Sequence, residues 1–140
     1  MVKVDIISRR IRSEKLYDSY RHTYSWLAII TTDQVKWPIS GVITTRDHTH
    51  KDATLDAMTT VVGNLARRKQ GHLPIIVKAY PEFHKFWMDS IKKGIRTPEQ
   101  ISGIRTEAVG KHYSIRVLPA YPSRSLSRQL SENIRQLVTK

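Results

Sequence analysis

The amino-acid sequence predicts a mixed α/β fold: three strands, a helix, a strand, a helix, a strand and a closing helix. Three observations lead to this order. Apolar and polar residues alternate at the start of the chain, a β-branched and aromatic stretch is divided by a short polar turn, and an apolar strand lies between two segments of helical spacing. A strand reached through a helix pairs in parallel by a right-handed crossover. The expected sheet is therefore mixed, with five strands of which the first three are antiparallel.

The first strand is predicted over residues 2–8, where Val2, Val4 and Ile6 stand at every second position. The next segment, residues 9–21, is polar and basic and lacks sustained periodicity. That composition predicts a positively charged loop.

Two further strands are predicted over residues 24–32 and 35–45, which are rich in β-branched and aromatic side chains. Asp33 and Gln34 form a short polar turn between them, so the pair is expected to be a hairpin. Pro38 suits an edge strand or a bulge, because proline has no N–H for the ladder.

The first helix is predicted to follow a polar segment, residues 47–52, and to end near residues 67–69 and Gly71. Basic residues in a last turn and a glycine beyond it are typical of a helix C-terminus. The apolar residues at helical spacing are Leu55, Met58, Val61, Val62 and Leu65.

The second half of the chain continues the alternation of strands and helices. Residues 73–80 are a short apolar run, typical of a strand covered on both faces. Pro81 opens a helix with an aromatic stripe that ends at Gly94, and residues 95–111 form a less regular connector. Residues 112–118 are the last predicted strand. The closing helix is marked by Leu126, Leu130, Ile134, Leu137 and Val138.

Charge is the unusual feature of the composition. The 140 residues include 24 Lys and Arg against 12 Asp and Glu, which makes the formal net charge +12 and the isoelectric point about 10.2. Such an excess favours a polyanion as partner, nucleic acid first and an anionic membrane surface second, with an inert basic surface as the alternative. The 39% hydrophobic share excludes intrinsic disorder, and the length predicts one domain over residues 1–140.

The chain has no cysteine, which excludes a disulfide framework, a thiolate zinc site and a cysteine nucleophile. No stretch approaches the roughly 20 apolar residues that span a bilayer. The first residues alternate and then turn basic, the reverse of a secretory signal. We therefore expect a soluble intracellular protein, cytoplasmic or nuclear, with no membrane contact.

Three stretches, in this order, resemble the ribonuclease H family. YSWLAIITTDQVKWPISGVIT followed by THKDATLDAM is similar to that family's second and third strands and first helix. LPIIVKAYPEF is similar to its fourth strand and the helix after it. FHKFWMDSIKKGIRTPEQ is similar to the helix and basic segment by which type 1 members grip a hybrid duplex. The resemblance covers essentially the whole chain and implies a ribonuclease H-like, mixed five-stranded sheet.

Active members of that family hold two magnesium ions between carboxylates, because hard cations prefer oxygen ligands and the two metals assist attack and departure at a phosphodiester. The resemblance puts the four carboxylate positions on Arg9, Thr54, Ala79 and either Leu130 or Ser131. None of these residues is acidic. The resemblance therefore implies a degenerate centre with no catalytic residue, no metal and no cofactor.

An arginine at the first position opposes the binding of a cation. We interpret Arg9 as taking over part of the metal's electrostatic role by contacting a phosphate; the alternative is that it points to solvent from a loop. Asp52 and Asp56 lie one helical turn apart and are the acids from which a shifted site could be built, although the apolar spacing puts both on a solvated face. His48 and His50 are interpreted as a solvated turn, because their spacing is not that of a zinc helix.

Basic residues gather in clusters along the sequence. Those near residues 9–15 would lie at the degenerate centre, and those near 85–96 on the duplex-gripping helix and its tail, while the others are explained by helix ends and solvated helix faces. Trp87 is a candidate for stacking on nucleic acid, with core packing beside Phe83 as the alternative. The candidate nucleic-acid-binding residues are Arg9, Arg10, Arg12, Lys15, Lys85, Trp87, Lys92, Lys93 and Arg96.

The sequence thus predicts a catalytically inactive ribonuclease H-like domain that binds duplex or RNA/DNA hybrid nucleic acid through a basic face, without hydrolysis. One alternative is a protein-interaction or oligomerisation domain whose degenerate cleft docks an acidic protein partner. The other is a residual metal-dependent nuclease that uses Asp52 and Asp56.

Overall fold

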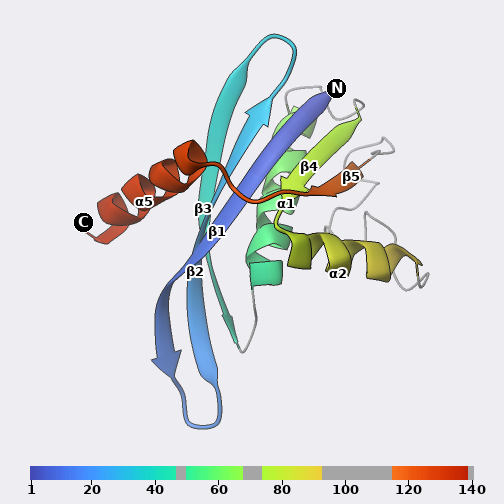
Figure 1. Ribbon diagram of the computed structural model, residues 1–140. Coiled ribbons are helices and arrows are strands. Elements are labelled where there is room, and N and C mark those ends of the chain that lie inside the picture. Colours follow the sequence, from blue (N-terminus) through green and yellow to red (C-terminus); the bar gives the residue numbers. More distant parts are fainter. Residues whose placement is uncertain (47–49, 68–73, 93–114, 139–140) are drawn as a thin grey trace.

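The computed structural model describes residues 1–46, 50–67, 74–92 and 115–138, and it confirms the predicted order of elements. One mixed, five-stranded sheet has the order β3-β2-β1-β4-β5 (Figure 1). Strand β2 is antiparallel to β1 and β3, whereas β1, β4 and β5 are parallel. The elements are β1 (Val2–Lys15), β2 (Tyr20–Thr31), β3 (Lys36–Arg46), α1 (His50–Arg67), β4 (Ile75–Ala79), α2 (Pro81–Lys92), β5 (Ile115–Pro119) and α5 (Arg124–Val138).

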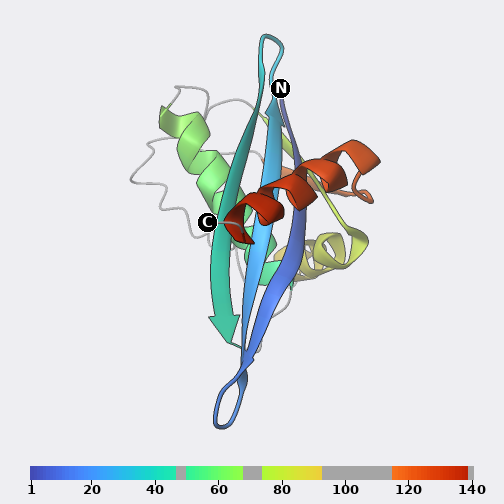
Figure 2. The ribbon, with the colours of Figure 1, turned by 90° about the vertical axis from the view of Figure 1, so that its left-hand side faces the viewer.

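Helices cover the two faces of the sheet unequally (Figures 1 and 2). On one face, α1 and α2 close the larger core, which contains Trp26, Phe83 and Trp87. On the other face, α5 crosses β1, β2 and β3 and closes a smaller core with Leu126 and Leu130. We call these the α1 face and the α5 face.

The alternation along β1 assigns its side chains to these two faces. Val2, Val4 and Ile6 are buried in the core of the α1 face, whereas Ile7 is buried beneath α5. Lys3 is exposed and Asp5 half-buried on the α5 face, so β1 is covered on both faces only from Ile6 to Ser8.

The prediction of a loop over residues 9–21 is wrong. Strand β1 continues to Lys15, and β2 begins at Tyr20 and pairs back along it. The segment lacks apolar periodicity because most of this part of the ribbon extends beyond the helices, as Figure 1 shows below β4 and α2, and only its ends, Arg9 beside α5 and the buried Thr23 and Tyr24, reach the body of the protein. We call residues 9–24 the arm.

The remaining boundaries differ from the predicted ones by a few residues. Helix α1 begins at His50, inside the predicted polar segment, and β5 begins at Ile115. The predicted connector at 95–111 lies outside the described residues. Among the helices that the structure describes, none is long and apolar enough to cross a membrane.

Trp26 joins three elements at the centre of the larger core. Its side chain is 1% exposed, and its indole Nε1 donates a hydrogen bond of 2.8 Å to Asp56 Oδ2 on α1. Gly41 on β3 pairs with Trp26, and a Cβ at this glycine would lie 2.6 Å from Trp26 Cζ2. Glycine is therefore required by the indole ring that lies over the backbone of β3.

Replacing Gly41 by alanine should destabilise the protein by about 1–3 kcal/mol, because the buried indole must shift and strain its neighbours. Gly63→Ala is the matched control: it lies in α1, and its nearest atom would be Arg67 Nη1 at 3.9 Å. That substitution should stabilise by about 0.5–1 kcal/mol, since alanine is the better helix former. Urea unfolding measures both variants, and equal midpoints would contradict the close approach.

Candidate nucleic-acid interface

Strands β1 and β4 pair in parallel only between Val2–Asp5 and Ile75–Lys78. Beyond these pairs β1 continues with β2, and the chain after β4 turns into α2. Ligands of open α/β sheets bind at such a switch point, outside the carboxyl ends of the parallel strands. A binding site is therefore expected at this point of the sheet.

Three hydroxyl groups meet at the switch point. Tyr80, which follows β4, has its phenolic oxygen 3.1 Å from Ser8 Oγ and 3.4 Å from Thr54 Oγ1. Thr54 on α1 is fully buried and Ser8 on β1 is 9% exposed. Burial raises the pKa of the Tyr80 hydroxyl above its usual value near 10.0, because it disfavours the phenolate. The Tyr80 hydroxyl therefore stays neutral at pH 7.

This donor set does not fit a two-magnesium centre. Magnesium ions at a phosphodiester are held by carboxylates, which supply both oxygen ligands and negative charge. Neutral hydroxyls supply no charge to offset the dehydration of the ions. In the parts of the chain that the structure describes, no group of three acidic or histidine residues could hold a metal ion.

The structure separates the four positions that the family resemblance marked. Thr54 faces the switch point as expected, but Ala79 is buried in the core, and the next residue, Tyr80, reaches Thr54 instead. Arg9 lies on the α5 face, where its guanidinium donates hydrogen bonds to Ser131 Oγ at 2.7 Å and Ser127 Oγ at 3.1 Å. The interpretation of Arg9 as a substitute for the metal is wrong, because the sheet separates it from Thr54.

Ser8 and Tyr80 were missed by the sequence analysis, although one signal could have found the first of them. The alternation of Val2, Val4 and Ile6 continues at Ser8, so Ser8 and not Arg9 shares the α1 face. Leu130, the other candidate for the fourth position, is fully buried beneath the sheet.

The prediction that Asp56 lies on a solvated face is also wrong. Its carboxylate is partly buried and accepts the indole hydrogen bond of Trp26 described above. This hydrogen bond between Asp56 on α1 and Trp26 on β2 holds the helix on the sheet. The Asp52 side chain, His48 and the side chain of His50 lie outside what the structure describes.

The arm has two faces of different chemistry. A register shift between Arg10 and Arg12 changes the ordinary alternation, so that Arg10 pairs with Tyr24 and Arg12 with Thr23. Adjacent residues of β2 point to opposite faces. Arg10 and Arg12 therefore lie on opposite faces, and the basic residues of this segment do not form one cluster.

We call the first of these faces the Tyr face; it consists of Arg10, Ser13, Lys15, Tyr20, His22 and Tyr24. Its rings follow one another along β2: Tyr20 and His22 are parallel with centroids 6.1 Å apart, and His22 meets Tyr24 edge-on at 6.4 Å. Ser13 Oγ lies 2.9 Å from His22 Nδ1 and holds that ring from the opposite strand.

The opposite face carries an ion pair. Arg21 donates from Nε to Glu14 Oε2 at 2.9 Å and forms a second bond from Nη2 to the same oxygen. This hydrogen bonding, with the positive charge of Arg21, lowers the pKa of Glu14. Charge on this face is thus partly compensated, whereas among the described residues Arg10 and Lys15 form no ion pair on the Tyr face.

The second predicted basic cluster is described only in part. Lys85 is exposed on α2. Trp87 is 1% exposed and packs against Phe83, with ring centroids 6.1 Å apart. It is therefore a core residue, and the prediction that it stacks on nucleic acid is wrong. The Lys92 side chain, Lys93 and Arg96 lie outside the described part.

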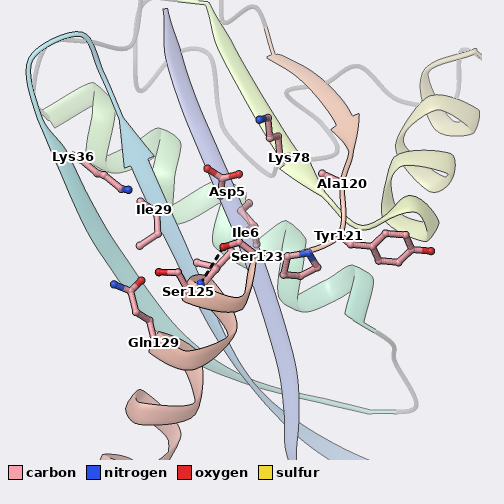
Figure 3. Close-up of a pocket in the computed structure, with 12 residues that line it drawn as sticks. Asp5, Ile6, Ile29, Lys36, Lys78, Ala120, Tyr121, Ser123, Ser125 and Gln129 are labelled. Atoms are coloured by element: carbon pink, nitrogen blue, oxygen red, sulfur yellow. Dashed lines mark hydrogen bonds between the residues drawn. The ribbon is translucent and has the colours of Figure 1, made fainter.

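A shallow pocket of about 410 Å³ lies on the α5 face, beside the first turn of α5 (Figure 3). Lys36 from β3, Lys78 from β4 and Asp5 from β1 line it together with Ser123 and Gln129. Ser123 Oγ accepts a hydrogen bond of 3.1 Å from the Leu126 N–H and caps α5. The pocket adds positive charge to the α5 face, on the side of the sheet away from the three hydroxyls.

The sheet order, the strand directions and the placement of the helices are those of a ribonuclease H-like α/β fold. No protein-family model matches the sequence, and a search of curated proteins finds no significant match.

Several solved structures are similar to the chain at low sequence identity. Ribonuclease H1 from the halophilic archaeon Halobacterium salinarum NRC-1 is 14% identical, covers 94% of this chain and 92% of its own, and has a TM-score of 0.44. The foamy viral protease-reverse transcriptase in complex with dsDNA is 11% identical, with coverages of 96% and 92% and a TM-score of 0.47. The PFV RNase H domain is 12% identical, with coverages of 95% and 90% and a TM-score of 0.48.

Tyr80→Phe should destabilise the protein by about 1–2 kcal/mol, because the buried hydroxyls of Ser8 and Thr54 each lose a partner. Its control, Tyr121→Phe, removes the hydroxyl of a side chain that is 81% exposed and should change stability by less than about 0.5 kcal/mol. Urea unfolding at neutral pH checks the pair.

The same variant has a predictable pH dependence. Because the folded pKa of Tyr80 is raised, its contribution to stability is complete below the unfolded value near 10.0 and is lost as pH rises further. The stability difference between wild type and Tyr80→Phe should therefore shrink above that pH. A constant difference would show that Tyr80 ionises equally in both states.

Proposed function

We propose that residues 1–140 form a single ribonuclease H-like domain that binds duplex or RNA/DNA hybrid nucleic acid through basic side chains and does not hydrolyse it. The observation that carries the proposal is the arm. It projects beyond the helices (Figure 1) and carries Arg9, Arg10, Arg12, Lys15 and Arg21 against two acids. Phosphates of a duplex are neutralised by side chains of this kind.

The proposed interface has two parts. The arm supplies the first part. Arg9 is bonded to neutral serine hydroxyls and keeps its charge, and Arg21 is the arm residue with a described acidic partner. The second part is the basic surface of α2 and the segment that follows it. Its proposed members are Lys85, Lys92, Lys93 and Arg96.

The proposed lack of hydrolysis is supported by the chemistry at the switch point. Ser8, Thr54 and Tyr80 supply neutral hydroxyls at the switch point, whereas a two-metal nuclease needs charged oxygen ligands. Asp56, the nearest alternative, is bonded to Trp26. An ion there would compete with the indole N–H for the same carboxylate.

Fluorescence anisotropy with labelled hybrid, double-stranded RNA and double-stranded DNA tests the binding. With four or five phosphates engaged, the logarithm of affinity should fall against the logarithm of salt concentration with a slope of roughly −4, about −0.9 for each contact. Removing Arg10, Arg12 and Lys15 together by alanine substitution should make the slope shallower by up to about 0.9 for each lost contact.

An equal change of charge elsewhere is the control. Arg124, Arg128 and Arg135 are exposed on α5, and their replacement by alanine should leave the slope nearly unchanged. Equal losses in both triple variants would mean that only net charge matters. If none of the three nucleic acids binds at low salt, the proposal is wrong.

Incubation of labelled hybrid with magnesium or manganese tests the lack of hydrolysis. We expect no metal-dependent cleavage above the level of a buffer control. Cleavage that disappears in Asp56→Asn would overturn the proposal and establish a shifted carboxylate site. Binding measured in the same samples shows whether the substrate was engaged.

A further inference from the structure

The Tyr face of the arm combines an exposed aromatic ring with positive charge that has no acidic partner among the described residues. Tyr20 is 48% exposed, and Arg10 and Lys15 lie on the facing strand, opposite Tyr24 and Tyr20. His22 continues the row of rings toward the body of the protein. A row of rings flanked by cations is the surface on which unpaired bases stack while their phosphates are neutralised.

Tyr17 extends this surface at the tip of the arm. Leu16 N–H donates a backbone hydrogen bond of 2.8 Å to the Ser19 carbonyl, which closes the turn and presents Tyr17 outward. The Tyr17 side chain is fully exposed, at 105%. It therefore adds nothing to the hydrophobic core, and its ring is available to a partner.

Protection of a strand edge does not explain this combination. Beyond Asp5, β1 has β2 as its only partner strand among the described residues, and charged side chains on such an edge discourage pairing with another chain. Arg10 and Lys15 serve that purpose, but exposed tyrosines beside the edge oppose it. The rings thus need a separate reason.

A nucleic-acid partner also explains the difference between the two faces. Among the described residues, Arg12 on the opposite face and Arg10 on the Tyr face both lack an ion pair, but only the Tyr face adds a row of aromatic rings. An acidic protein could match the charge, but it would supply few flat rings to match the aromatic row. Nucleotides supply a phosphate and a flat base at every step.

We infer that the Tyr face binds unpaired nucleotides adjoining the duplex, an inference that rests on the proposed function. One base would stack on Tyr20 and another on Tyr17, and their phosphates would contact Arg10 and Lys15. The protein would then prefer a duplex with a single-stranded overhang to a blunt one. Arg10 and Lys15 would lie at the junction, where they contact phosphates of the duplex end as well as those of the overhang, and the other basic residues would hold the rest of the duplex.

The test compares a blunt RNA/DNA hybrid with the same hybrid carrying a short single-stranded overhang, by anisotropy titration. Wild type should bind the overhang substrate more tightly. Tyr20→Ala should lower that affinity roughly 5- to 100-fold, the range for loss of one base-aromatic stack, and leave blunt-duplex affinity unchanged. Tyr17→Ala should act in the same direction, and Tyr20→Phe should retain wild-type affinity because the ring remains.

Two further measurements show whether a loss of affinity comes from lost stacking, from lost charge or from unfolding. Tyr20→Ala should keep the salt slope of wild type, since a stacked ring releases no counterions, whereas Arg10→Ala should reduce it. A 2-aminopurine base in the overhang should be quenched by wild type and by Tyr20→Phe but not by Tyr20→Ala. Tyr121→Ala, an exposed tyrosine outside the arm, is the matched control and should behave as wild type in every assay.

The outcomes distinguish this inference from the function on which it rests. If the blunt hybrid binds but the overhang brings no gain, or if Tyr20→Ala and Tyr121→Ala behave alike, the inference is wrong and the proposed function stands. If neither substrate binds, both fail. Overhang preference that requires the Tyr20 ring supports the inference.

Discussion

The short parallel pairing of β1 with β4 is the constraint on which the rest of the molecule depends. It joins Val2–Asp5 to Ile75–Lys78 and then stops, while β1 continues with β2 as its partner. The separation of the two strands creates the switch point between the halves of the sheet. It also leaves the arm, in which β2 is the only described partner strand of β1, to extend beyond the body of the protein (Figure 1). The buried hydroxyls and the exposed arm are therefore consequences of one topological feature.

Polar chemistry is distributed differently at these two places. At the switch point, Ser8, Thr54 and Tyr80 satisfy one another as neutral groups, which is what burial requires because a charge would need a partner. On the arm, water solvates the backbone and side chains, so cations can remain without ion pairs. The buried hydroxyls and the charged arm, whose five basic and two acidic residues contribute +3 of the net charge of +12, are thus separate parts of the chain.

Hydrogen bonds from the sheet hold a helix on each face. Trp26 donates to Asp56 of α1, and Arg9 donates to Ser127 and Ser131 of α5. Both donors lie on the central strands, next to a buried apolar contact. Asp56, the candidate for a shifted metal site, and Arg9, a proposed phosphate contact, therefore both have structural partners.

The sequence by itself determined the order of the elements and the mixed sheet, because both follow from local periodicity and from the order of strands and helices along the chain. It also determined that Arg9, Thr54, Ala79 and Ser131 carry no carboxylate. Only the tertiary structure decided which side chains meet. The arm was not predictable because its strands are held by backbone pairing with no core to impose a pattern, and a register shift, invisible in composition, put Arg10 and Arg12 on opposite faces. Contacts between residues distant in the sequence, such as that of Tyr80 with Ser8, depend on strand register, and one residue of register moves a side chain to the other face of a sheet.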